Sequence, residues 1–406
     1  MTASERAART IPTDALVGVV GAGAMGSGIA QVVAAAGHTV LLADVNPGAV
    51  EKARATISNA LQRLIEKGRL AAATRDQIQG RIHFIDAPLA DLRTYHRCDL
   101  VIEAVIEDLA VKRSIFEQLD GCAAPDAVLA TNTSSLSVAS IASACTRPDR
   151  VLGIHFFNPA PVMPLVEVVP WLGTDADVLA RALRVVAAWG KTTVVAADTP
   201  GFIVNRIARP FYGEALRILE EGIADAATID WAMRELGSFR MGPFELMDFI
   251  GNDVNYAVTR AVFEGLFYDP RYKPSLTQRR LVEAGFLGRK TGRGYYDYRA
   301  GAARPEPRRD ATTGLLILER ILAMLMNEAI DAVYLRVASP ADIDLAMTTG
   351  VNYPRGLLAW ADQRGLDWVM GWMTRLHDEY REDRYRPSPL LRRMAAEGRR
   401  FHERDA

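Results

Sequence analysis

The chain has little cysteine, almost no net charge and no long apolar run, and each shortage excludes a class of protein. Its three cysteines in 406 residues, Cys98, Cys122 and Cys145, form neither a CxxC pair nor a zinc spacing, so we expect reduced thiols and no metal site. A net charge of −1 gives no basic surface for nucleic acid. No segment reaches the roughly 18 apolar residues of a membrane span, and residues 1–14 lack the apolar core of a signal peptide. We therefore expect a globular cytoplasmic protein with a frayed N-terminus at residues 1–14.

The first half of the chain alternates short apolar runs with helical patterns. Between the first two runs, apolar residues from Met25 to Ala36 recur at helical spacing, and residues 49–67 carry a second, longer helical pattern. A strand, a helix and a second strand in this order predict a parallel sheet built from right-handed crossovers. The runs expected as strands are residues 16–20, 40–43, 100–104, 128–131 and 151–156.

The second half is dominated by helical patterns and contains an internal repeat. We expect its first helix to begin at Pro200–Gly201, since proline is accepted in a first helical turn, and we interpret residues 299–311 as a linker rich in Pro, Ala and Arg. Residues 206, 214, 230 and 242 match 320, 328, 344 and 356 in type and at equal separations, which indicates a duplication. The sequence thus predicts an α/β domain at 15–198 and two all-α domains, at 199–298 and 312–406.

A glycine-rich motif, Gly21-Ala22-Gly23-Ala24-Met25-Gly26, follows the first predicted strand and opens the first predicted helix. There the first glycine permits a tight turn, the second lets the backbone approach a pyrophosphate, and the third lets helix and strand pack closely. Asp44, at the end of the second predicted strand, can bind both ribose hydroxyls of NAD and would repel the extra phosphate of NADP. We expect a Rossmann-type domain that binds NAD. A flavin site and a glycine turn of another α/β fold are the alternatives.

Of the six histidines, only His155 lies at the carboxyl end of a predicted strand, where open α/β sheets bind ligands. Positions 155 and 167 lie symmetrically about Pro161, so a hairpin centred there would place His155 beside Glu167 across two strands. A glutamate in the apolar run LVEVV is costly unless it is paired, and an imidazole removes that objection. The pair resembles the base and orienting carboxylate of the Ser-His-Asp arrangement, in which histidine accepts a hydroxyl proton.

Two further polar residues lie at positions that fit this site. Ser134 follows another strand and should reach the same edge of the sheet, although it, Ser135 or Ser137 could instead cap the helix that starts near residue 138. Asn205 lies in an otherwise apolar segment shortly after Pro200, where a structural amide at the domain junction is the alternative.

At these residues the sequence closely resembles the 3-hydroxyacyl-CoA dehydrogenase family, which includes the bacterial 3-hydroxybutyryl-CoA dehydrogenases. The resemblance covers residues 15–298 and is most specific in HFFNPAPVMPLVEVV (155–169) and DTPGFIVNR (198–206). The repeat at 312–398 resembles the extra domain of longer bacterial members associated with phenylacetate degradation, which are assigned to 3-hydroxyadipyl-CoA or 3-hydroxybutyryl-CoA. This chain departs from them in its short linker. Other matching stretches are GAGAMGSGIA (21–30), VIEAVIEDLAVK (101–112), TNTSSLS (131–137), GPFELMD (242–248) and LGRKTGRGYYDY (287–298).

The resemblance implies an oxidoreductase that reversibly transfers a hydride from C3 of a (3S)-3-hydroxyacyl-CoA to NAD, in fatty acid β-oxidation or aromatic-acid degradation. His155 would take the hydroxyl proton, Glu167 would stabilise the imidazolium, and Ser134 and Asn205 would hold the substrate oxygens. The family binds CoA along helices inserted after the second strand, which makes Lys67 and Arg69 candidate contacts here. NAD contacts carried over from the family are Gly21, Gly23, Ala24, Met25, Gly26, Asp44, Glu107, Lys112, Asn132 and Lys290.

Other functions are a dehydrogenase of free hydroxy acids, which would need no CoA-binding helices, and a non-catalytic NAD-binding protein. Retention of all four catalytic residues argues against the latter. Single-copy relatives dimerise through the helical domain, so the two copies here would pair within one chain or between two chains. Because Glu319 stands where the first copy has Asn205, we expect one active site per chain and a structural second copy. Arg355 is a candidate partner for a distal carboxylate on the substrate. Acyl chain length and physiological direction stay open.

Overall fold

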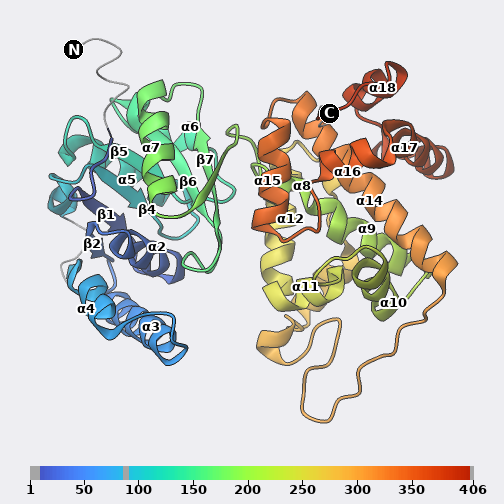
Figure 1. The fold of residues 1–406 in the computed structure, drawn as a ribbon, viewed down its shortest axis with the longest axis horizontal. Coiled ribbons are helices and arrows are strands. Elements are labelled where there is room, and N and C mark those ends of the chain that lie inside the picture. The colour runs from blue at the N-terminus through green and yellow to red at the C-terminus, as the bar shows by residue number, and fades with distance from the viewer. Residues whose placement is uncertain (1–9, 86–90, 403–406) are drawn as a thin grey trace. The chain divides into compact units, whose positions relative to one another are not determined.

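The computed structural model describes residues 10–85 and 91–402. They form two compact units, and the boundary between the units along the chain lies between Thr199 and Pro200. Most of the N-terminal segment expected to be frayed lies outside the described residues. Across residues 10–85 and 91–402, no helix combines the length and apolar character that a membrane span requires. Each unit is described separately below (Figure 1).

The first unit is built on a single eight-stranded sheet in the order β3-β2-β1-β4-β5-β6-β7-β8. All neighbours pair in parallel except β6 and β7, which form an antiparallel hairpin. The predicted parallel sheet is therefore confirmed. The strands are β1 (Leu16–Val20), β2 (Thr39–Ala43), β3 (Ile82–Ile85), β4 (Leu100–Glu103), β5 (Val128–Thr131), β6 (Val151–Phe156), β7 (Leu165–Pro170) and β8 (Thr192–Val195).

The two strands that the sequence did not predict, β3 and β8, are the two edges of the sheet. Each has four residues and includes polar positions that are not buried, such as His83 and Thr192. An edge strand has one neighbour and less cover than a central one, so it does not need a continuous apolar run.

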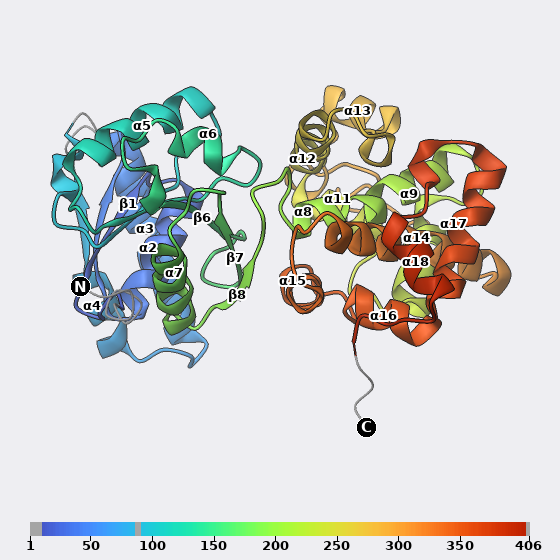
Figure 2. The same cartoon turned by 90° about the horizontal axis from the view of Figure 1, so that it is seen from above.

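Helices cover both faces of the sheet, with α5 and α6 on one side and α2 and α7 on the other (Figure 2). An apolar cluster of buried residues joins α2, α3 and α7 to the strands. The predicted helix at 49–67 is α3, where Asn46 caps the first turn and Pro47 occupies its first position. The helices are α2 (Ala24–Ala35), α3 (Pro47–Glu66), α4 (Ala72–Gly80), α5 (Leu109–Cys122), α6 (Val138–Ala142) and α7 (Ala176–Ala188).

The second unit is helical, but its first helix does not begin at Pro200–Gly201 as the sequence suggested. Gly201 and Phe202 have φ angles of +80° and +46°, in the left-handed region, and the helix begins only at Val204. The helices are α8 (Val204–Ile207), α9 (Arg209–Glu220), α10 (Ala226–Trp231), α11 (Pro243–Ile250), α12 (Asn252–Gly265), α13 (Leu276–Glu283), α14 (Ala311–Tyr334), α15 (Pro340–Gly350), α16 (Leu357–Arg364), α17 (Leu366–Tyr380) and α18 (Pro389–Ala396).

The two copies of the repeat pack against each other through α9 and α14 (Figure 1). Arg206 of the first copy pairs with Glu328 of the second at 2.9 Å, and the equivalent Arg320 pairs with Glu214 of the first at 2.6 Å. Such reciprocal contacts are the signature of a two-fold interface, here formed within one chain. All four side chains are buried, so each charge depends on its partner in the other copy.

A second set of repeated residues explains why aspartate and glycine are equally spaced in the two copies, at 230 and 242 and at 344 and 356. Asp230 accepts hydrogen bonds from the backbone of Phe244 and Glu245, and Asp344 does the same for Leu358 and Ala359. Each aspartate thereby satisfies the first turn of the following helix. A Cβ on Gly242 or Gly356 would lie 2.3 Å from the aspartate side chain, so only glycine fits beside it.

Replacing one carboxylate of the reciprocal pairs should destabilise the second unit strongly. Glu328→Gln leaves Arg206 and Arg271, which Glu328 also contacts, short of a buried partner, and we expect a loss of roughly 3–5 kcal/mol of unfolding free energy. The matched control is Glu264→Gln in an exposed pair with Arg260, which should cost less than about 1 kcal/mol. Urea unfolding of both variants measures the difference. Equal losses would contradict the role assigned to the buried pairs.

Candidate active site

The loop between β1 and α2 has the shape that a pyrophosphate requires. Gly21 has a φ of +102°, and a Cβ on Gly26 would lie 1.8 Å from the Gly21 carbonyl oxygen, so both positions need glycine. A Cβ on Gly23 would meet nothing within 4 Å, and Gly23 and Ala24 are exposed beside the half-buried Met25. No side chain among the described residues caps the N-terminus of α2. Its backbone N–H groups therefore suit the phosphates of a dinucleotide.

Asp44 directly follows β2 and is tied to the glycine-rich loop. One carboxylate oxygen accepts a hydrogen bond of 2.7 Å from the Ala22 backbone, and the other accepts one of 2.9 Å from Asn46. These bonds hold the carboxylate beside the loop, at the carboxyl end of the strand that neighbours β1. An acid in this place suits the ribose hydroxyls of NAD.

Glu107 organises the loops that follow β4 and β5. Its Oε1 accepts hydrogen bonds from the Thr133 hydroxyl at 2.6 Å and from the Ser134 backbone at 3.0 Å. Burial would raise the pKa of Glu107, but the charge of Lys112 and these hydrogen bonds outweigh it and lower that pKa. Glu107 is therefore an anion at neutral pH, and it fixes the backbone on which Ser134 is carried.

Lys112 is almost completely buried, at 1% exposure. Its ammonium group lies 2.6 Å from Glu103 and 3.4 Å from Glu107. Glu103 is itself fully buried and also accepts a hydrogen bond from Thr131 at 2.7 Å. In this geometry Lys112 joins two carboxylates and holds Glu107 in place.

Asn132 and Ser134 both follow β5, at the same edge of the sheet as His155. The Asn132 side-chain oxygen accepts a hydrogen bond of 2.8 Å from the backbone of Phe156, the residue after His155. Ser134 is half-buried, and the residue that caps α6 is Ser137, whose hydroxyl accepts a bond from Ser140. The alternative in which Ser134 serves as the helix cap is thus removed.

His155 and Glu167 face each other across the β6–β7 hairpin in the register predicted from the sequence. His155 Nδ1 lies 2.7 Å from Glu167 Oε2, with the carboxylate fully buried and the histidine 5% exposed. Because the carboxylate has no access to water, its contact with the imidazole compensates for part of the cost of burying it. The Phe157 ring packs against the imidazole at 4.6 Å between centroids.

The turn that joins the two strands of this hairpin is held from two sides. Lys191, just before β8, donates hydrogen bonds of 2.6 and 2.8 Å to the carbonyls of Ala160 and Met163. On the other side, a Cβ on Gly28 of α2 would lie 3.2 Å from Ala160 and from Pro161. The turn between His155 and Glu167 therefore packs directly on the helix that begins at the glycine-rich loop.

The remaining predicted residues are exposed or belong to the second unit. Asn205 is half-buried in α8, and Lys290 is 45% exposed and lies 2.6 Å from Asp253. Lys67 and Arg69 are exposed just after α3. Arg355 is exposed and contacts Gln363 and the Trp360 ring.

Sequence reasoning missed two acidic residues that organise the site. Glu103 stands in the apolar run LVIEAV. Glu167 was identified because a carboxylate in an apolar strand needs a partner, and the same argument applies to Glu103, which is also buried. Asp198 accepts bonds from Ser137, Val138 and Ala139 and so fixes the start of α6. Asp198 opens the DTPGFIVNR segment, but its role could not be predicted, because its partners lie about sixty residues earlier in the chain.

Comparison with known proteins agrees with this geometry. The family model for the 3-hydroxyacyl-CoA dehydrogenase NAD-binding domain matches residues 16–199. The model for the C-terminal domain of the same family matches twice, at 201–298 and 316–404, which confirms the internal repeat.

The chain is also similar to characterised relatives over most of its length. It is 38% identical to the 3-hydroxyadipyl-CoA dehydrogenase of Escherichia coli, covering 93% of this chain and 97% of that protein. It is 43% identical to the 3-hydroxybutyryl-CoA dehydrogenase of Bradyrhizobium diazoefficiens, covering 72% of this chain and 98% of that one. The crystal structure of an Escherichia coli 3-hydroxybutyryl-CoA dehydrogenase superposes with a TM-score of 0.88 at 37% identity, covering 94% of this chain and 98% of that one.

Three features lead to one conclusion. They are the glycine-rich loop before the uncapped N-terminus of α2, the buried His155–Glu167 pair and the duplicated helical domain. The chain belongs to the 3-hydroxyacyl-CoA dehydrogenase family and is an NAD-dependent oxidoreductase of 3-hydroxyacyl-CoA.

Proposed function

We propose that the enzyme oxidises (3S)-3-hydroxyadipyl-CoA or (3S)-3-hydroxybutyryl-CoA to the 3-oxo thioester, in a β-oxidation sequence for fatty or aromatic acids. The observation that carries this proposal is the buried contact of 2.7 Å between His155 and Glu167. The two substrates are those named for the relatives in Escherichia coli and Bradyrhizobium diazoefficiens.

His155 is the base that takes the proton from the C3 hydroxyl. Its Nδ1 is engaged by Glu167, so Nε2 is the nitrogen that accepts the proton. As the ring becomes positively charged, its attraction to the buried carboxylate strengthens, and the transition state is stabilised more than the bound substrate. NAD, when bound, supplies the acceptor for the hydride that leaves C3.

Ser134 and Asn205 hold the substrate oxygens. Ser134 is suited to this because Glu107 fixes its backbone and because Ser137 takes the capping role. For the second unit, the support is the match of the DTPGFIVNR segment, with Asn205, to the family pattern. Direction depends on the ratio of oxidised to reduced cofactor and on pH, since the reaction releases a proton.

For NAD we propose contacts from the glycine-rich loop, Asp44, Glu107, Asn132 and Lys290. Lys112 acts differently from the others, because its ammonium group is buried between Glu103 and Glu107. We assign it the role of holding Glu107. Lys67 and Arg69 are exposed at the end of α3 and are candidates for the phosphates of CoA.

We further propose that internal pairing of the repeats replaces a dimer contact, so that one chain carries one active site. The reciprocal pairs of Arg206 with Glu328 and of Arg320 with Glu214 support this. Exchange of the second copy between two chains would give the same contacts, and sedimentation of the full chain distinguishes the two.

Removing the base or the charge of its partner should lower turnover without abolishing cofactor binding. His155→Ala and Glu167→Gln should each reduce kcat by roughly 10²–10⁴-fold, with smaller changes in KM, because the pair acts mainly in the transition state. The control is His96→Ala, an exposed histidine, which should leave kcat unchanged. Steady-state rates with 3-hydroxybutyryl-CoA and titration with NAD are the measurements. A rise in KM alone would show that Glu167 is only a binding residue.

Asp44 should set the preference for NAD over NADP. Asp44→Ser removes the carboxylate that we propose binds the ribose hydroxyls, so KM for NAD should rise. It also removes the charge that would repel the extra phosphate of NADP, so the preference for NAD over NADP in kcat/KM should narrow by roughly tenfold or more. The measurement is kcat/KM with each cofactor at fixed substrate. An unmodified enzyme that used both cofactors equally would overturn the assignment.

A further inference from the structure

Arg209 is a buried cation with no acidic partner among the residues that the structure describes. It is 6% exposed at the start of α9. Its Nε donates to the Asn205 carbonyl at 2.7 Å, and its Nη1 donates to the Thr259 hydroxyl at 2.9 Å and the Asn255 carbonyl at 3.5 Å. All three acceptors are neutral. Within residues 10–85 and 91–402, no carboxylate lies within ion-pairing distance of Arg209.

The other buried arginines of the second unit show how unusual this is. Every other buried arginine that the structure describes in this unit pairs with at least one carboxylate from α9, α14 or the loop before Tyr272. These arginines are Arg206, Arg271, Arg320 and Arg384. Burial acts to lower the pKa of Arg206, but Glu328 outweighs it and raises that pKa. Arg209 lacks such a carboxylate, and burial lowers its pKa. A buried charge that the protein leaves uncompensated is costly, which points to an anion brought by a ligand.

A second polar group without a partner lies in the same region. Tyr353, in the second repeat, is 5% exposed, and its hydroxyl makes no hydrogen bond to any described residue. Burial and Tyr212 raise the pKa of Tyr353 well above its usual value, while the charge of Arg209 pulls it down. The hydroxyl is therefore protonated and able to donate a hydrogen bond. It also lies close enough to Arg209 for the charge of the guanidinium to act on it.

Aromatic packing holds both groups in place. The Arg209 guanidinium lies 4.9 Å from the centre of the Tyr212 ring. The Tyr353 ring contacts Phe211 and Phe239, with centroids 5.7 and 5.1 Å away. Guanidinium and hydroxyl are thus set by rigid rings, as a preorganised binding site requires.

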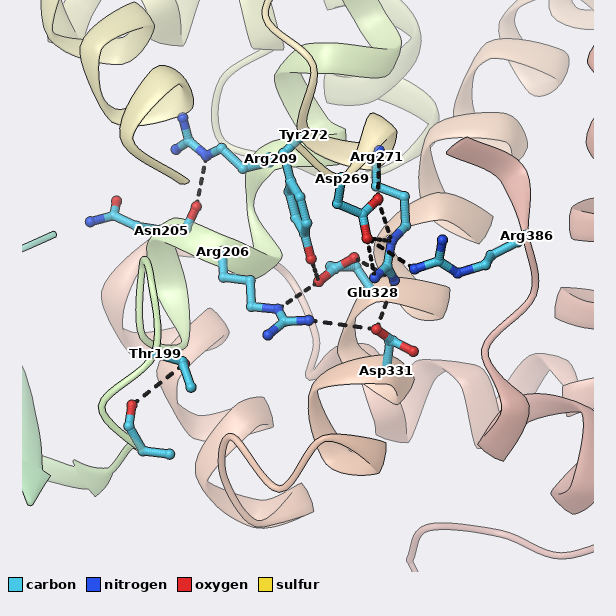
Figure 3. Close-up of polar contacts among 11 residues, drawn as sticks. Thr199, Asn205, Arg206, Arg209, Asp269, Arg271, Tyr272, Glu328, Asp331 and Arg386 are labelled. Carbon is cyan, nitrogen blue, oxygen red and sulfur yellow. Dashed lines mark hydrogen bonds and ion pairs between the residues drawn. The ribbon is translucent and has the colours of Figure 1, made fainter. Parts of the chain in front are cut away.

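The position of Arg209 relates it to the substrate. It follows Asn205 by one helical turn, roughly 5.4 Å along a helix axis. Figure 3 shows the Asn205 amide and the Arg209 guanidinium extending to the same side, while Arg206 extends toward Glu328 and Asp331. Under the proposed function, Asn205 holds an oxygen near C3, and the inference requires the acyl chain to extend from there along α8 toward Arg209.

We propose that Arg209, assisted by Tyr353, binds the terminal carboxylate of a dicarboxylic acyl thioester, so that the preferred substrate is of the 3-hydroxyadipyl-CoA type. This inference rests on the proposed function and names its substrate class. Guanidinium is the cation best suited to a carboxylate, because its planar N–H groups match the two oxygens.

The assignment gives the second repeat a role beyond structural support. Tyr353 occupies the position that Phe239 holds in the first copy, and the two rings contact each other across the repeat interface. The second copy thus contributes a hydroxyl where the first contributes only apolar surface. A single-copy relative has no residue of the same chain at this place.

The test compares two thioesters that differ only in the distal carboxylate, 3-hydroxyadipyl-CoA and 3-hydroxyhexanoyl-CoA, with the full-length enzyme. We expect Arg209→Met to lower the ratio of kcat/KM for diacid over monoacid by about 100-fold or more. Tyr353→Phe keeps the ring and should lower the same ratio by about 10-fold. The control Arg375→Gln alters an exposed arginine of the second repeat and should leave the ratio unchanged, and Arg355→Gln tests the alternative partner named from the sequence.

Thermal unfolding provides a second, independent readout. Arg209→Met removes an uncompensated charge and should leave Tm unchanged or raise it, whereas Arg206→Met leaves Glu328 and Asp331 short of a partner and should lower it. Equal losses for both thioesters in Arg209→Met, or a falling ratio only in Arg355→Gln, would overturn the inference and leave the proposed function intact. An unmodified enzyme that oxidised neither thioester would refute the proposed function itself.

Discussion

Buried charge must be compensated, and this constraint governs both units of the enzyme. In the first unit, Glu167 is matched by His155 and Glu103 by Lys112, each within 2.7 Å. In the second, Glu214 of α9 and Glu328 of α14 are matched by arginines from the opposite copy. Removing one partner leaves the other as a buried, unpaired charge, which is costly. Each pair therefore holds together the two elements that carry it. The His155–Glu167 pair is one case of this rule, and the repeat interface is another.

The arrangement of the sheet brings the first unit's functional groups to one edge. Parallel strands deliver their following loops to the same side, which collects the glycine-rich loop, Asp44, Glu107 and Asn132. The antiparallel β7 then returns Glu167 beside His155. The turn between them packs against Gly28 and is bonded by Lys191. Cofactor loop and catalytic pair are in this way joined through α2.

The two copies of the helical domain bury charged residues against each other. Arg206, next to Asn205 in the chain, is held by Glu328 and Asp331 of the second copy (Figure 3). The segment that carries Asn205 therefore depends on residues more than a hundred positions later. Among the described buried arginines of the second unit, Arg209 is the one without a carboxylate partner, and the proposed substrate carboxylate gives this a reason.

Much of this enzyme was determined by the sequence itself. The glycine pattern, the apolar runs and their order fixed the Rossmann-type sheet, because a buried parallel strand needs a continuous apolar run. Symmetry about Pro161 gave the pairing of His155 with Glu167, since hairpin register follows from the turn. Equal residue spacings revealed the repeat before any contact was known.

Only the tertiary structure decided the rest. Edge strands β3 and β8 escaped detection because half-exposed strands lack an apolar run. The left-handed backbone at Gly201 and Phe202 delays α8, although proline and glycine there are also compatible with a helix start. The network around Lys112, the reciprocal arginine pairs and the isolation of Arg209 all depend on residues distant in the chain. No local pattern encodes which side chain will lack a partner, because that is a property of the packed interior.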